Sequence, residues 1–155
     1  MRSGVRLGVD VGKVRIGVSR SDLHGMLATP VETVARSEDA ADRRRIAEIV
    51  TELGVFEIIV GLPLALSGAQ TASTADAIGF AESLEREVGV PVRLVDERLS
   101  TVSAHSALRA SGKNSKSARP VVDQVAATII LQHALDAERT TGQPPGKPLE
   151  PNIGL

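Results

Sequence analysis

The feature that most restricts the fold is a pair of short alternating runs at the start of the chain. They read VRLGVDV at 5–11 and VRIGVSRS at 14–21, and only Gly12 and Lys13 separate them. Apolar residues that alternate with other residues are typical of a strand with one buried face. Because a two-residue connection joins antiparallel neighbours, we expect a β-hairpin.

After this hairpin the pattern alternates between helical and extended. Short apolar runs that end at Gly or Pro predict buried strands, and longer segments with apolar residues every three or four positions predict helices. The predicted elements are an edge strand at 28–33, a helix at 38–53 with Ser37 as N-cap and Gly54 as stop, a strand at 56–60, a helix at 71–88, a strand at 90–97, a short helix from Ser100 or Thr101 to Ala110, and a long helix at 121–138. Strand, helix, strand indicates a right-handed crossover between parallel strands. We therefore expect an α/β domain with a five-stranded mixed sheet, antiparallel in strands 1–3 and parallel in strands 4–5, with helices on its faces.

The chain has 155 residues, which suits one domain. We place this domain at 1–139. Residues 140–155 are rich in Pro and Gly and lack periodicity, so they are expected to be disordered.

Composition excludes several kinds of chemistry. There is no Cys, so disulfides, thiolate zinc sites and a Cys nucleophile are excluded, and any metal must bind oxygen or imidazole ligands. There is no Trp or Tyr, so nucleic acid would be bound through phosphate contacts rather than by stacking on those rings. The net charge of −1 means that such contacts need local basic patches. No apolar run reaches the roughly 20 residues of a membrane span and no signal peptide is evident, so we expect a cytoplasmic protein.

Three carboxylates are candidates for a shared site. Asp10 lies inside an apolar strand, where an ionised group needs compensation. Glu97 ends the last buried strand, and Asp123 lies in the expected first turn of the last helix. Adjacent strands would place Asp10 beside Glu97, and a helix across the strand ends would add Asp123. Taken singly, Asp10 could be a strand-end residue, Glu97 could pair with Arg98, and Asp123 could favour the helix dipole.

Three carboxylates in one place repel each other unless cations lie between them. Hard oxygen ligands select Mg²⁺ or Mn²⁺, and a pair of such ions is the usual device for in-line phosphoester cleavage. The sequence contains no recognisable nucleophile motif, which agrees with this chemistry.

Four segments of the sequence carry a family resemblance: GVDVGKVRIGVS, IIVGLPLALSG, VRLVDERLSTVSA and VVDQVAATIILQHAL. The chain resembles the YqgF/RuvX family, described as Holliday-junction-resolvase-like proteins and as pre-16S rRNA nucleases. The resemblance implies a ribonuclease H-like fold, Asp10, Glu97 and Asp123 as the acidic site, and metal-dependent cleavage of structured RNA or branched DNA. It also implies a role in maturing the 5′ end of 16S rRNA. Many family members have Lys shortly before the final Asp, and here Lys116 or Arg119 must replace it.

Several residues are candidates for binding nucleic acid. Gly12 allows the turn and a close approach of phosphate to the backbone, with Lys13 and Arg15 as nearby cations. Arg98 either clamps a phosphate or pairs with Asp96. The loop at 111–119 contains Lys113, Lys116 and Arg119 without an acid, so it is either a phosphate-facing patch or a solvated loop.

Three functions remain open at this point. The leading one is a Mg²⁺- or Mn²⁺-dependent nuclease that processes pre-16S rRNA. The second is a four-way DNA junction resolvase, expected to be a homodimer because two strands must be cut symmetrically. The third is a non-catalytic nucleic-acid-binding module on the same fold. A phosphotransferase of the actin/hexokinase type ranks low because its second lobe has no room here.

Overall fold

The computed structural model describes residues 1–97 and 115–149, and within the latter range the side chains from 123 onward. Its elements are β1 (Val5–Val11), β2 (Arg15–Ser21), β3 (Ala28–Ala35), α1 (Ala41–Leu53), β4 (Val55–Leu62), α2 (Ala72–Val88), β5 (Val92–Asp96), α4 (Ser115–Thr141) and β6 (Lys147–Pro148). The predicted helix at 100–110 lies outside the described residues.

One mixed sheet forms the centre of the molecule, in the order β3-β2-β1-β4-β5-β6. β1 and β2 pair antiparallel, as do β2 and β3, whereas β4 is parallel to β1 and β5 is parallel to β4. The hairpin, the edge position of β3 and the parallel crossover are thus confirmed. Pro30 lies in β3 where the pairing with β2 shifts register, which suits a residue without an N–H.

The expected count of five strands is wrong by one, because β6 pairs antiparallel with β5. The sixth strand lies in the segment that was expected to be disordered. Arg93 holds it by donating to the carbonyls of Pro145 and Gly146, and the amide of Leu149 donates to Val92 O. Short, Pro-containing segments carry no strand periodicity, so only the tertiary contacts with β5 reveal this strand.

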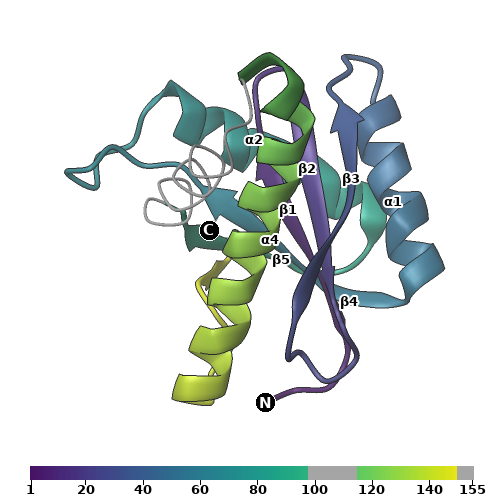
Figure 1. Ribbon diagram of the computed structural model, residues 1–155, viewed down its shortest axis with the longest axis vertical. Coiled ribbons are helices and arrows are strands. Elements are labelled where there is room, and N and C mark those ends of the chain that lie inside the picture. Colours follow the sequence, from purple (N-terminus) through teal and green to yellow (C-terminus); the bar gives the residue numbers. More distant parts are fainter. Residues whose placement is uncertain (98–114, 150–155) are drawn as a thin grey trace, which may run out of the picture.

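Helices cover both faces of the sheet, with α4 on one face and α1 and α2 on the other (Figure 1). Buried aliphatic side chains and Phe80 form the core under α1 and α2. A smaller core under α4 contains Ala28, Ile59, Ile130, Leu131, Ala134 and Leu135. No helix in the described ranges has the length and apolar character needed to cross a membrane.

The helix boundaries follow local capping signals at most ends. Gly54 ends α1 in the left-handed conformation. Thr71 caps α2 and forms a reciprocal capping box with Thr74. The predicted N-cap of α1 is wrong: Ala40 holds that position, with φ 70°, while Ser37 Oγ accepts from the amide of Asp42 at 2.9 Å.

Helix α4 begins at Ser115, six residues before its predicted start, so the segment 115–119 is helical rather than a loop. These polar residues have no apolar periodicity, although Ser, Lys, Ala and Arg are compatible with a helix. As a consequence, Asp123 lies in the third helical turn rather than the first. The helix-dipole interpretation of Asp123 therefore does not hold, since that effect fades within the first turn.

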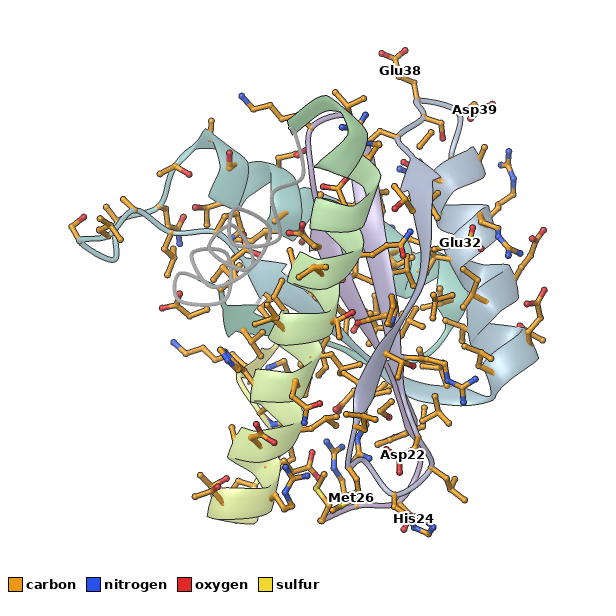
Figure 2. All side chains as sticks on the ribbon, in the orientation of Figure 1. Asp22, His24, Met26, Glu32, Glu38 and Asp39 are labelled. Atoms are coloured by element: carbon orange, nitrogen blue, oxygen red, sulfur yellow. The ribbon has the colours of Figure 1, made fainter. Side chains whose placement is uncertain are left out.

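The β2–β3 turn and the β1–β2 turn lie at opposite ends of the molecule (Figure 1). Figure 2 shows Asp22, His24 and Met26 at the β2–β3 turn, opposite the loop that carries Glu38 and Asp39. The Asp22 carboxylate accepts three backbone N–H groups of this turn, which lowers its pKa. Helix α4 starts at the end of the molecule where the β1–β2 turn lies (Figure 1).

Candidate active site

Asp10 lies one residue before the end of β1, directly opposite Gly17 of β2. Its carboxyl group is largely shielded from water, and this burial raises its pKa to about 6. The charge of Asp123 raises it further, whereas a hydrogen bond with Glu97 acts in the opposite direction. Asp10 is therefore a strand carboxyl in an environment that penalises an uncompensated charge.

Glu97 follows β5 and is only 8% exposed. Its amide donates to Leu62 O at 3.3 Å, which fixes the backbone against the end of β4. Burial raises the pKa of Glu97 to about 8, with a further contribution from the negative charge of Asp10. Its Oε2 is buried, and no group in the described part of the chain donates a hydrogen bond to it. A buried carboxylate oxygen without a donor is costly, so it requires either a proton or a cation.

β1 and β5 are not neighbours, because β4 lies between them. The expectation that adjacent strands bring Asp10 and Glu97 together was therefore wrong, although the two carboxyls do meet. Gly61 of β4 makes this meeting feasible: a Cβ there would lie 2.3 Å from Glu97 Oε2. Gly61 thus belongs to the strand rather than to the following loop, and its missing side chain leaves the space that Glu97 occupies.

Asp123 reaches the site because α4 lies unusually close to the hairpin. A Cβ on Gly17 would lie 1.9 Å from the carbonyl oxygen of Asp123, and a Cβ on Gly8 would lie 2.9 Å from Ala127 O. Ser19 Oγ donates to that same Ala127 carbonyl at 2.8 Å. Because Gly17 is also the cross-strand partner of Asp10, this contact sets Asp123 beside Asp10.

The side chain of Asp123 forms an ion pair with Arg15. Arg15 Nε donates to Asp123 Oδ2 at 3.2 Å, and the two side chains are 32% and 19% exposed. Burial raises the pKa of Asp123, and Arg15 partly offsets this.

The structure therefore brings Asp10 and Glu97 close enough for each to shift the pKa of the other, and it places Asp123 close enough to Asp10 to raise the pKa of Asp10. Among the residues that the structure describes, no three acidic or histidine side chains already form a cage for a metal ion. The partnerless oxygen of Glu97 and the paired carboxyls nevertheless suit a hard divalent cation, which prefers carboxylate oxygen.

The basic candidates have different surroundings. Lys13 is exposed in the β1–β2 turn. The amide of Gly12 donates to Arg15 O at 2.9 Å and a Cβ would lie 2.5 Å from that oxygen, so Gly12 closes the turn. Lys116 and Arg119 lie on the first turns of α4, where only the backbone is described. Arg98 and Lys113 lie outside the described residues.

Arg36 is a supporting residue that sequence reasoning missed. Its Nη1 donates to Gly12 O and to Asp76 Oδ2, both at 2.9 Å, and its guanidinium lies over the ring of Phe80. It thereby ties the β1–β2 turn to α2. A single Arg after an edge strand gives no signal of this role, because its partners are distant in sequence.

Residues 4–137 match the model of a family described as RuvX, Holliday junction resolvase. The chain belongs to the RuvX family. A protein of Leifsonia xyli subsp. xyli is 83% identical to this RuvX-family chain over 154 residues, which cover 99% of each sequence. It carries the name "Putative pre-16S rRNA nuclease". A Streptomyces coelicolor protein of the same name is 50% identical over 97% of this chain and 90% of its own.

Solved structures agree on the fold. Thermus thermophilus RuvC in complex with a Holliday junction substrate is 20% identical, with a TM-score of 0.57, over 94% of this chain and 99% of RuvC. The ribonuclease H-like fold is thereby confirmed. Family, relatives and fold together support a nuclease that hydrolyses phosphodiester bonds.

Proposed function

We propose that this RuvX-family chain is a Mg²⁺- or Mn²⁺-dependent endonuclease whose metal ligands are Asp10, Glu97 and Asp123. The observation that carries the proposal is the buried Asp10–Glu97 pair, in which Glu97 Oε2 has no hydrogen-bond donor among the residues that the structure describes. Without a cation, the pair retains a proton, which Glu97 donates to Asp10. A divalent ion compensates the same negative charge and leaves both carboxylates ionised.

A pair of such ions held by these carboxylates would supply two-metal chemistry, in which one ion would activate the attacking water and the other would stabilise the leaving oxygen of a phosphodiester. The protein's own groups hold the ligands in place. Gly61 leaves room for Glu97 over β4, and Gly17 lets α4 approach until Asp123 lies beside Asp10. Lys13 and Arg15 lie on the same hairpin and would bind flanking phosphates. We assign the same role to Arg98, Lys113, Lys116 and Arg119.

We propose the 5′ end of pre-16S rRNA, processed in the cytoplasm, as the leading substrate, because the curated relatives carry that name. The alternative is a four-way DNA junction, which the family description favours. Junction resolution would require a homodimer, since two strands are cut. The chain alone would suffice for a single cut in RNA.

The test is a comparison of end-labelled precursor rRNA and a four-way DNA junction as substrates at identical salt, with Mn²⁺, with Mg²⁺ and with EDTA. We expect metal-dependent cleavage of the RNA, and its loss in Asp123→Asn. The matched control is Asp136→Asn, an exposed acid on the same helix, which should cleave like wild type. Paired cuts in the junction alone would establish the alternative substrate. Binding of either substrate without cleavage under any metal would identify a non-catalytic module and refute the proposal.

A further inference from the structure

Within residues 1–97 and 123–149, the Arg15–Asp123 ion pair places a basic side chain on one of the three acids and on neither of the other two. Asp10 and Glu97 are more buried than Asp123, and neither accepts a hydrogen bond from a described Lys or Arg side chain. Asp123 is the most accessible of the three, and Arg15 Nε binds it at 3.2 Å. The positive charge of Arg15 therefore lies beside the least buried of the three acids, whose negative charge carries a smaller desolvation penalty than those of Asp10 and Glu97.

The backbone around this pair leaves little freedom to rearrange. Gly17 is in close contact with the carbonyl group of Asp123, so the helix cannot move closer to the sheet. Arg15 is the first residue of β2, and its carbonyl accepts the amide of Gly12. An exchange of partners by the Arg15 and Asp123 side chains therefore needs no movement of the sheet or of α4.

Resting on the proposed function, we propose that Arg15 competes with the divalent ion for Asp123. The observation behind it is that Arg15 Nε already holds the Asp123 carboxylate, at 3.2 Å from Oδ2. When a cation enters, Asp123 exchanges Arg15 for it. The released guanidinium is then free to bind a substrate phosphate, for which its planar donor set is suited.

Competition by Arg15 and ordinary support by Arg15 predict opposite changes in metal affinity when the residue is replaced. A residue that merely orients a ligand strengthens metal binding, so its removal weakens binding. A competitor weakens metal binding, so its removal strengthens it. Partly exposed ion pairs are weak, and we expect about a two- to fivefold gain in Mn²⁺ affinity when Arg15 is neutralised.

The experiment is calorimetric titration of Mn²⁺ into the full chain without nucleic acid, for wild type, Arg15→Gln and Arg15→Lys. Lys13→Gln is the matched control, because it removes one positive charge from the same hairpin without breaking a bond to Asp123. We expect Arg15→Gln to bind Mn²⁺ more tightly than Lys13→Gln does, with Arg15→Lys between wild type and Arg15→Gln. Thermal melts verify folding, and Arg15→Lys carries the test if Arg15→Gln does not fold.

The titrations distinguish a failure of the proposed competition from a failure of the proposed nuclease function. Wild type that binds Mn²⁺ and cleaves RNA, together with an Arg15→Gln variant of equal or lower affinity, overturns the competition and leaves the proposed function intact. An affinity gain no larger than that of Lys13→Gln also overturns it, since general charge removal then explains the effect. If no variant binds Mn²⁺, both the proposed function and this inference fail.

Discussion

Gly17 offers the sharpest test of how the fold positions Asp123. A Cβ at this residue would lie 1.9 Å from Asp123 O, whereas ordinary contacts begin at 3.4 Å, so Gly17→Ala requires β2 and α4 to move apart by roughly 1.5 Å at this point. The obstacle is backbone on both sides, and no side chain can rotate away. We expect a loss of about 1–3 kcal/mol in the free energy of unfolding, typical of overpacking.

The same shift moves Asp123 relative to Asp10. A misplacement of about 1 Å can reduce catalysis by roughly 100-fold, so we expect metal-dependent cleavage to fall by a comparable factor. Urea unfolding measures the stability, and cleavage rates are measured well below the unfolding midpoint. Gly79→Ala is the matched control: Gly79 lies inside α2 with no described atom within 4 Å of a new Cβ, so this change should stabilise the chain by about 0.5–1 kcal/mol.

The reasoning is refuted if Gly17→Ala unfolds and cleaves like wild type. A stable but inactive variant would agree with displacement of Asp123 at lower strain. A variant that loses stability while its folded fraction cleaves at the full rate would show that the close approach serves packing alone.

Two further predictions concern ionisation. Burial raises the pKa of Glu97 from 4.5 to about 8, so between these pH values the folded state holds a proton that the unfolded chain has lost. The free energy of unfolding without metal should therefore fall as pH rises from about 4.5 to about 8. Urea midpoints in EDTA should show this slope for wild type and for the exposed control Glu52→Gln, and a flatter one for Glu97→Gln; equal slopes in all three would contradict the role of Glu97. Glu138 accepts bonds from Arg2 and the buried Arg6, which lower its pKa to about 2, so its contribution to stability is complete above pH 4.5 and lost as pH falls through about 2. Glu138→Gln should cost on the order of 3 kcal/mol at neutral pH in a denaturant melt, and a loss under roughly 1 kcal/mol would show that Arg6 is satisfied without it.

Local patterns were sufficient for the hairpin, the buried parallel strands, the C-terminal end of α1 and both ends of α2. Alternation with period two identifies the extended segments, and residues such as Gly54 and Thr71 end or begin a helix through contacts within a few residues. These signals fail where structure depends on a distant partner. β6 is a strand only because β5 lies beside it, and the start of α4 has no apolar stripe.

The sequence by itself determined the order of most elements and the identity of the candidate acids, because periodicity, capping and short motifs are encoded within local windows. Only the tertiary structure decided how those acids relate: Glu97 reaches Asp10 across β4 through the space at Gly61, and Arg15 binds Asp123. The reason is physical. Close approach depends on which atoms are missing from the opposite element, and an ion pair depends on three-dimensional distance, and neither leaves a trace in the spacing of residues along the chain.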